Sequence, residues 1–322
     1  MIPALLTFDI EDWFQVENLR PLFPPASWEA IPRRVADATR RVLRLLAEHQ
    51  IRSTFFVLGW VAEREPELVH EIAAGGHEIA CHGYGHVLPM QLTPLQFRDD
   101  VVRAKTILEE IGGKEVVGYR APSFSLDRER LAILEDCGFH YDSSHHPFAL
   151  HDRYGRLGDL GPPIAPGVYA AGERMVELEL PVEHVGGLAL PVSGGGYFRL
   201  YPAALFRSLV ARTIARRGSY LMYLHSWEFD PGQPRVQGLA PTRAARHYVN
   251  LSRTAPRMRQ LIAMLERRAA RFMTASEFAG AIRRSVTALT QGRRVPPETS
   301  AVARPPAELP PCASPQSAPK AG

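Results

Sequence analysis

The chain has 322 residues, 45% of them hydrophobic, and its 38 basic and 34 acidic residues give a net charge of +4. This length suits one large α/β domain or two smaller ones, and dispersed basic residues argue against nucleic-acid binding. Three isolated cysteines, Cys81, Cys137 and Cys312, provide neither a CxxC motif nor a disulfide framework, which favours a reducing compartment. We find no signal-peptide pattern and no segment long enough to span a membrane, so we expect a soluble, cytoplasmic protein.

Short apolar runs alternate with segments of helical periodicity along the first half of the chain. The first run ends on a group of acids, Asp9, Glu11 and Asp12, and a proline-rich connection follows at 17–32. Thr93 and Pro94 have the pattern of a helix N-cap followed by proline in the first turn. In chain order, we predict strands at 5–8, 53–59, 77–81 and 116–119, and helices at 33–49, 60–74, 94–111 and 127–137.

The second half of the chain is less regular. A strand is predicted at 139–141, and the Pro- and Gly-rich segment at about 145–200 is expected to hold two or three short strands, one of them at 175–180. Further elements are predicted at 202–217 (helix), 220–224 (strand), 242–250 (short helix), 257–268 (helix), 272–274 (strand) and 275–284 (helix). We therefore assign one domain to 1–284, with an extension from about 230, and a disordered Pro/Ala-rich tail to 285–322.

Strand–helix alternation over most of the chain predicts an α/β fold with a mostly parallel sheet and right-handed crossovers. A closed or nearly closed β/α barrel is favoured, and a doubly wound open sheet is the alternative. Reactive residues in β/α barrels lie at the C-terminal ends of the strands. We expect one rim to gather the five polar residues that directly follow predicted strands: Asp9, His82, Arg120, Asp142 and His225.

His82 and His86 lie four residues apart across two glycines, a spacing that suits a pair of metal ligands. Two histidines and one carboxylate are a common ligand set for Zn²⁺, and the metal lowers the pKa of a bound water to roughly 7. A second carboxylate could act as base and a further histidine as acid. Cys81 should face away from His82 along a strand, so we expect a core cysteine. These parts suit a metal-dependent hydrolase of amides or esters.

In sequence order, these residues resemble the motifs of the polysaccharide deacetylases (carbohydrate esterase family four, with the chitooligosaccharide deacetylase homology domain) over roughly 4–280. The matching motifs lie at 7–9, 82–86, 120–124 and 224–225. Segments 8–14, 54–60, 118–125, 194–199, 225–231 and 247–250 are similar to the branch encoded with exopolysaccharide and PEP-CTERM/exosortase loci. The resemblance implies a deformed (β/α)₇ barrel and removal of N-acetyl groups from the amino sugars of a polysaccharide, in exopolysaccharide biosynthesis.

The resemblance also implies roles for the motif residues. Asp9 would be the catalytic base, Arg120 would orient Asp9, and His225 would be the catalytic acid. His82 and His86 would bind a divalent metal, expected to be Zn²⁺, with Co²⁺, Mn²⁺ or Ni²⁺ as alternatives. The partner would be an N-acetylated polysaccharide or oligosaccharide.

The third metal ligand departs from the pattern of the family, much of which has two adjacent aspartates. Here Ile10 and Glu11 separate Asp9 from Asp12. Asp12 is the first choice for the ligand. Glu11 is the alternative, because it would share a face with Asp9 if the strand continued. For the acid that tunes the catalytic histidine, Asp142 is the candidate.

The glycines at 194–196 are not followed by Gly-Lys-Ser/Thr, so we expect a tight turn near the sugar cleft and no nucleotide P-loop. Tyr84, Tyr197 and Trp227 are candidates for contacts with sugar rings. Two other functions fit the same residues: a metal-dependent amidase that acts on a small amide, and a polysaccharide-binding protein without catalysis.

Overall fold

A curled, mostly parallel sheet, in which β1 (Ile2–Ile10) pairs with three other strands, forms the framework of the protein. The computed structural model describes residues 1–148, 157–158 and 160–290. Hydrogen bonding follows the order β10-β1-β2-β3-β4-β5-β7-β6, with β6 antiparallel and β11 paired to the first residues of β1. The strands are β2 (Thr54–Val57), β3 (Glu78–Cys81), β4 (Gly118–Tyr119), β5 (Tyr141–Asp142), β6 (Val168–Ala170), β7 (Val176–Leu178), β10 (Tyr220–His225) and β11 (Ala270–Phe272).

The predicted α/β fold is confirmed, and the sheet is a half-barrel. Within the described residues the hydrogen-bonded path ends at β10 on one side and at β6 on the other. A separate two-stranded sheet pairs β8 (Val182–Val185) with β9 (Leu188–Pro191). Parallel strands place their C-terminal ends at one edge, and the register sets Asp9 of β1 opposite His225 of β10.

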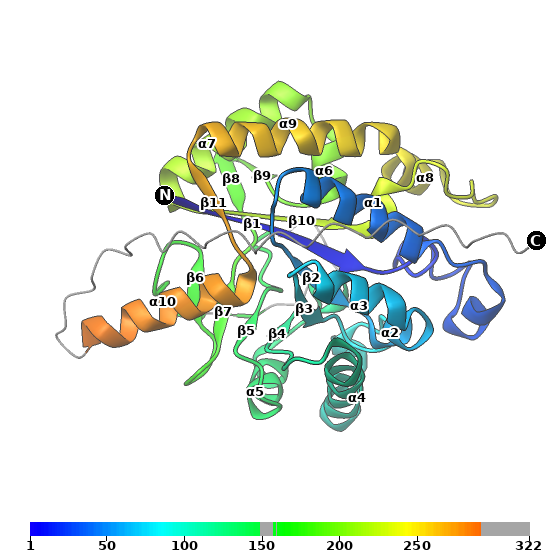
Figure 1. Cartoon of the computed structure of the whole chain (residues 1–322), viewed down its shortest axis with the longest axis horizontal. Helices are drawn as coiled ribbons and strands as arrows, with labels where there is room; N and C mark the ends of the chain where they lie inside the picture. Colours follow the sequence, from blue (N-terminus) through cyan, green and yellow to red (C-terminus); the bar gives the residue numbers. More distant parts are fainter. Residues whose placement is uncertain (149–156, 159, 291–322) are drawn as a thin grey trace, which may run out of the picture.

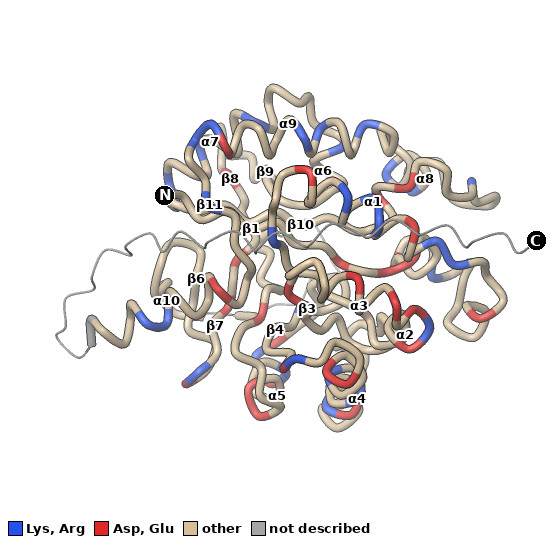
Figure 2. Tube along the Cα trace, viewed as in Figure 1, with Lys and Arg blue, Asp and Glu red and all other residues tan. Residues whose placement is uncertain are grey.

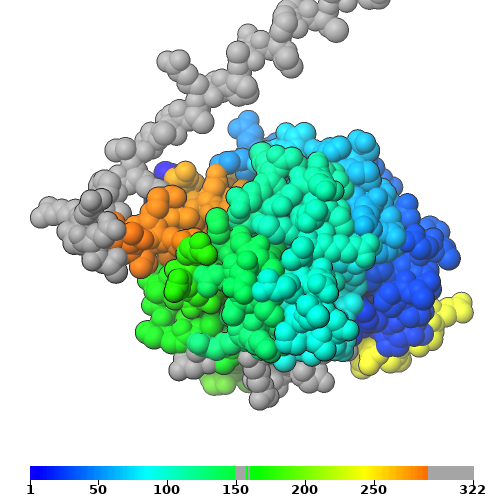
Figure 3. All heavy atoms as spheres, turned by 90° about the horizontal axis from the view of Figure 1, so that it is seen from below, coloured from blue at the N-terminus to red at the C-terminus, as the bar shows by residue number. Residues whose placement is uncertain are grey.

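Helices cover the outside of the curled sheet (Figure 1). Helix α4 packs against β3, α7 against β10 and α9 against β11. In Figure 3, α10 lies beside the segment that contains β6 and β7. The helices are α1 (Val35–Glu48), α2 (Gly59–Arg64), α3 (Pro66–Ala74), α4 (Pro94–Gly112), α5 (Arg128–Asp136), α6 (Gly195–Leu200), α7 (Ala203–Arg217), α8 (Pro241–Tyr248), α9 (Thr254–Arg267) and α10 (Ala275–Thr290).

Two predicted helix boundaries were wrong, and the turn predicted at 194–196 leads into a helix. The helix predicted at 60–74 is two helices, because Pro66 begins α3 and cannot continue α2. The glycines at 194–196 open the short helix α6 after a turn at Gly194, whose φ is 97°. The last helix continues to Thr290, beyond the predicted end at 284. The rest of the predicted tail and Cys312 lie outside the described residues.

The core fills the space between the sheet and its helices. Cys81 is buried there, as predicted, and burial raises the pKa of its thiol. Among the described residues, no helix combines the length and the apolar character that a membrane span requires.

Candidate active site

Asp9 and Arg120 form a buried ion pair at the C-terminal edge of the sheet. Arg120 Nη1 donates to Asp9 Oδ1 at 2.7 Å and to Thr7 Oγ1 at 2.9 Å. Its Nε and Nη2 donate to the carbonyl and the hydroxyl of Ser143, and its guanidinium lies 4.1 Å from the centroid of the Phe56 ring. Because each of its three nitrogens donates a hydrogen bond, the guanidinium is held in place and fixes one orientation of the Asp9 carboxylate.

Beside this pair, Glu11, His82 and His86 converge on one point. Each offers a ligand atom, and these atoms all lie within 4.8 Å of one another. His82 Nδ1 lies 2.7 Å from the carbonyl oxygen of Arg120, an arrangement that keeps the proton on Nδ1 and leaves Nε2 available as a ligand. Burial lowers the pKa of His82 to about 4, so the ring is neutral, which is the form that binds cations.

Asp12, the first choice for the third ligand, points away from this cluster. Its Oδ2 accepts from the backbone N–H groups of Arg34 and Val35 at 2.7 and 3.0 Å, at the start of α1. Side chains alternate along an extended chain, so Glu11 follows Asp9 toward the cluster and Asp12 does not. The geometry therefore corrects the expectation for Asp12 and favours the alternative, Glu11.

The loop between the two histidines is fixed by a carboxylate from α4. Asp100 Oδ2 accepts from the backbone N–H of Tyr84 at 3.0 Å. Gly83 has a φ of +75°, and a Cβ there would lie 3.0 Å from Asp100 Oδ2. Glycine is therefore needed for both the backbone conformation and the close approach, and together they aim His82 and His86 at Glu11.

His225 lies at the end of β10 and faces three carboxylates. Its Nε2 is 3.9 Å from Asp9 Oδ2 and 3.6 Å from Glu11 Oε1, and its Nδ1 is 3.3 Å from Glu228 Oε2. Burial lowers the pKa of His225, but the negative charges of the carboxylates outweigh it and raise the pKa to about 9. The ring therefore carries a proton at neutral pH and is placed to donate it.

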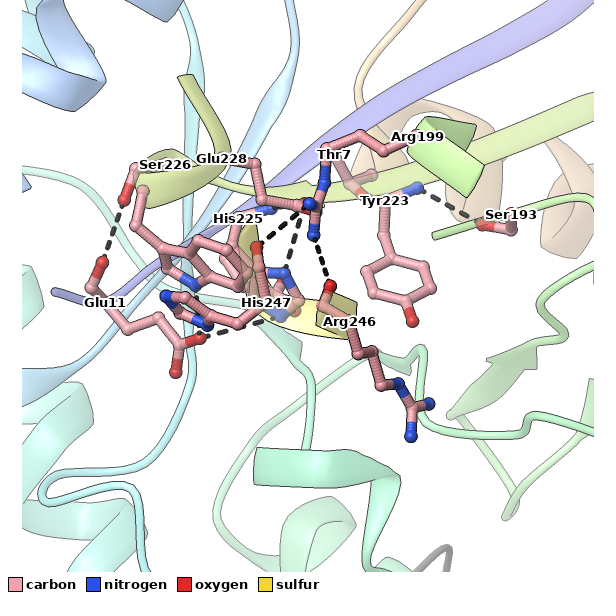
Figure 4. A network of polar contacts seen from close by, with 12 residues as sticks. Thr7, Glu11, Ser193, Arg199, Tyr223, His225, Ser226, Glu228, Arg246 and His247 are labelled. Carbon is pink, nitrogen blue, oxygen red and sulfur yellow. Dashed lines mark hydrogen bonds and ion pairs between the residues drawn. The ribbon is translucent and has the colours of Figure 1, made fainter. Parts of the chain in front are cut away.

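Glu228, in the 3₁₀ helix η4 (Ser226–Phe229), is the acid partner of His225, and sequence analysis missed it (Figure 4). Its Oε2 accepts from the backbone N–H of His225 at 2.9 Å, and its Oε1 accepts from Arg199 Nε at 2.8 Å. Burial raises the pKa of Glu228, but the positive charges of Arg199 and His225 outweigh it and bring the pKa to about 2. Its position three residues after His225 was the available signal, because that spacing returns a side chain toward its neighbour on a helical turn.

Asp142, the predicted tuning acid, lies at the end of β5 and contacts other groups. Its Oδ1 accepts from Ser144 Oγ at 2.8 Å, and it shares a buried acid pair with Glu177. Burial raises the pKa of both carboxyl groups. The expectation for Asp142 is corrected, because Glu228 occupies the position next to His225.

An open cleft lies over these groups and is lined by Asp9, Glu11, His82, His86, His225, Tyr197 and Trp227, among others. Trp227 stacks with His247 at a centroid distance of 4.4 Å and with His225 at 5.4 Å. Its Nε1 donates to Glu11 Oε1 at 3.1 Å. Tyr197 and Trp227 therefore line the cleft, and their contact with a sugar stays a prediction.

Tyr84, the third predicted sugar contact, lies outside the cleft. Its hydroxyl donates to Glu63 Oε2 at 2.7 Å, and the Arg103 guanidinium lies 3.5 Å from the centroid of its ring. These contacts hold Tyr84 against α2 and α4. The expectation of sugar stacking at Tyr84 is corrected, because its ring is already covered by a cation.

The donor set of the cluster fits a divalent cation such as zinc. One carboxylate and two imidazoles form a common ligand set that leaves positions open. Glu11 Oε2 is buried and lies 2.7 Å from His86 Nε2, and the buried His86 Nδ1 has no hydrogen-bond partner within the described part of the chain. Buried polar atoms of this kind are costly unless a bound group satisfies them.

One edge of the half-barrel therefore brings together an acid–arginine pair, a carboxylate–histidine cluster and a protonated histidine. Residues 4–141 match the family described as polysaccharide deacetylase. Residues 143–279 match a domain of unknown function, DUF3473.

Two relatives each match about a third of the chain. A peptidoglycan deacetylase-like protein of Gibberella zeae is 38% identical over 106 residues, which are 32% of this chain and 31% of that protein. The peptidoglycan deacetylase of Helicobacter pylori is 31% identical over 121 residues, 37% of this chain and 41% of that protein. The chain thus matches less than half the length of these relatives.

A solved structure shows the same fold over almost the whole chain. It is a Mycobacterium smegmatis protein assigned as a polysaccharide deacetylase, with a TM-score of 0.57 and 23% identity, and the match covers 94% of each chain. The match includes the second half, so the elements around α6, α8 and α9 are part of one architecture.

Proposed function

We propose that this protein is a metal-dependent hydrolase that removes N-acetyl groups from the amino sugars of a polysaccharide in exopolysaccharide biosynthesis. The observation that carries the proposal is one cleft in which an oriented carboxylate, a carboxylate–histidine cluster and a protonated histidine lie side by side. The family match of residues 4–141 and the names of the relatives support the same reaction.

The proposed reaction assigns one task to each group. Asp9, held by Arg120, accepts a proton from the attacking water. A divalent cation, expected to be Zn²⁺, would be held by Glu11, His82 and His86 and would supply Lewis-acid polarisation. As the C–N bond of the tetrahedral adduct breaks, His225 donates its Nε2 proton to the departing amine. The products are acetate and a free amino sugar.

The test is acetate release from chitin oligomers and from an acetylated exopolysaccharide by the purified chain. We expect a chelator to abolish release and added Zn²⁺ or Co²⁺ to restore it. Asp9→Asn should lose most turnover and still bind zinc, because Asp9 is not in the cluster. Acetate release that continues undiminished in chelator would contradict the proposal. Turnover of small acetamides alone would indicate an amidase, and sugar binding without turnover a binding protein.

A further inference from the structure

Charge is distributed unevenly along this chain. Between residues 184 and 265 there are eleven arginines, and the acids of that segment are Glu228 and Asp230 alone. The whole chain has 38 basic and 34 acidic residues, so acids outnumber basic residues in the remainder. Both acids of the segment are already engaged, Glu228 by Arg199 and Asp230 by Arg34. The second half of the domain therefore presents excess positive charge, and basic segments recur along α7 and α9 in Figure 2.

Five arginines of this segment form what we call the arginine surface: Arg207 of α7, Arg243 and Arg246 of α8, Arg253 of the 3₁₀ turn η5 (Leu251–Arg253), and Arg257 of α9. Arg243, Arg246 and Arg253 are exposed. Arg207 donates to Gln260 Oε1 at 3.1 Å, and Arg257 donates to the carbonyl oxygen of Arg199 at 2.9 Å. Both acceptors are neutral oxygens, so they hold the Arg207 and Arg257 side chains in place without neutralising their charge.

Three of these arginines, Arg207, Arg253 and Arg257, are close enough to affect one another. Burial lowers the pKa of Arg257, and the positive charges of Arg253 and Arg207 lower it further. Like charges gathered on one surface repel, and that cost is relieved when an anion binds between them. The clustering therefore points to an anionic ligand.

Arg199 connects the arginine surface to the cleft. Its buried guanidinium donates to the carbonyl oxygens of His247 and Val249 at 3.0 and 2.6 Å, and its own carbonyl accepts from Asn250. These bonds hold the end of α8 and the start of α9 against α6. Residues of α6 and α8, Tyr197 and Arg246 among them, line the cleft, so the surface continues into it. Figure 4 shows the Arg246 side chain extending beyond the contacts of His225 and Glu228.

We propose that the arginine surface binds carboxylates on the sugars that flank the residue being deacetylated, so that the substrate is an acidic polysaccharide containing uronic acids. The arginine guanidinium is planar and its paired N–H donors match a carboxylate. A polymer that enters the cleft must continue beyond it, and on this side it meets the arginines. This inference rests on the proposed function, because it assigns the substrate class of the same cleft.

The test measures binding by the zinc-loaded full chain carrying Asp9→Asn, which prevents turnover. The probes are oligosaccharides of alternating N-acetylglucosamine and glucuronate, and chitin oligomers of equal length. At about 50 mM salt we expect the acidic probe to bind at least about tenfold more tightly, and at about 300 mM most of this preference should vanish through screening. The double variant Arg243→Glu/Arg253→Glu should remove the preference. Arg44→Glu, at an exposed position on α1, is the matched control and should retain it.

Three outcomes would overturn the inference: equal affinity for both probes, a preference that survives the double variant, or equally tight binding of single-stranded DNA of the same charge. Acetate release from neutral chitin oligomers by the unmodified chain reports separately on the proposed function. Release without an acidic preference would leave that function standing and remove this inference. Selective binding of the acidic probe without release of acetate from any acetylated probe would contradict the proposed function, while the acidic preference of the arginine surface would remain.

Discussion

Glu11 and Asp12 are neighbours with different tasks because consecutive side chains of an extended segment point to opposite sides. Glu11 Oε2 lies 2.7 Å from His86 Nε2 in the cleft, whereas Asp12 accepts hydrogen bonds from backbone N–H groups at the start of α1. At the scale of single residues, this alternation places the Glu11 side chain in the cleft and gives Asp12 a structural role at the start of α1.

Substitutions of Glu11 and of Asp12 should therefore differ in their effects on zinc affinity and on the free energy of unfolding. We expect Glu11→Gln to weaken zinc binding by at least about tenfold, since it removes a charged ligand. Asp12→Ala should leave zinc affinity intact and lower the free energy of unfolding by about 1–3 kcal/mol, because buried N–H groups lose their acceptor. Zinc titration calorimetry and denaturant unfolding of the metal-free variants measure both effects. Loss of zinc binding in Asp12→Ala with Glu11→Gln unaffected would reverse the assignment.

Some site residues could be predicted from the sequence and others could not. Asp9, His82, Arg120 and His225 each lie at the C-terminal end of a strand, and these ends of parallel strands meet at one edge of the sheet. The choice between Asp12 and Glu11 depended on how far β1 extends, and the observed strand reaches Ile10. Tyr84 was misplaced because its environment depends on contacts with helices distant in sequence.

At the scale of elements, α6 has a glycine-rich start because two other elements press against it. Gly194 has a φ of +97°, and a Cβ there would lie 2.7 Å from the Tyr223 ring. A Cβ at Gly195 would overlap the Glu228 carboxylate, whereas one at Gly196 would meet nothing within 4 Å. The run of glycines thus lets the backbone of α6 approach Glu228, the carboxylate next to His225.

Gly195→Ala and Gly196→Ala form a matched pair. Gly195→Ala should displace Glu228, lower the thermal stability and reduce turnover at least about tenfold, since the orientation of His225 is lost. Gly196→Ala should change the free energy of unfolding by no more than about 0.5–1 kcal/mol, because alanine suits a helix and the space is open. Thermal melts and acetate-release assays compare the two. Equal stability of both variants would argue against close packing at position 195.

Regular elements were predicted well where periodicity is local. The helices α1, α4 and α7 lie within two residues of their expected starts, because their apolar spacing and, for α4, the capping residue are encoded within one segment. The region between β5 and α6 was predicted only coarsely. Its short strands are defined by pairing with β5 and with each other, which local patterns do not encode.

At the scale of the whole molecule, the two sequence families on this chain are not two structural units. Strands β10 and β11, both from the second half, pair with β1 from the first half. The edge of the sheet that carries the candidate site therefore needs both halves of the chain, since Asp9 comes from the first half and His225 from the second.

We accordingly expect a fragment of residues 1–142 not to fold alone, because β1 would lack its neighbour β10 and expose an apolar edge. Co-expression with residues 143–290 should restore a folded complex and acetate release. Circular dichroism and limited proteolysis of the fragment check the first point. A cooperatively folding 1–142 fragment would show that the first family region is an independent domain.

Stability should depend on pH through His77, which lies at the start of β3. Burial, together with the charge of Arg52, lowers the pKa of His77 from 6.5 to about 4. Between these values the unfolded chain binds a proton that the folded chain excludes, so the free energy of unfolding falls as the pH drops through this range. His77→Gln should flatten this part of the profile. Denaturant unfolding at several pH values from about 7 to about 4 measures both slopes, and parallel profiles would contradict the assignment.

The pairing of β1 also sets the order in which the protein can fold as it is synthesised. Among the described strands β1 is synthesised first, and its three partners begin at residues 54, 220 and 270. One side of β1 must therefore stay unpaired until most of the described chain has been synthesised. We expect chaperones to bind this apolar strand during translation, and termination before β10 would release a chain in which that side of β1 has no partner.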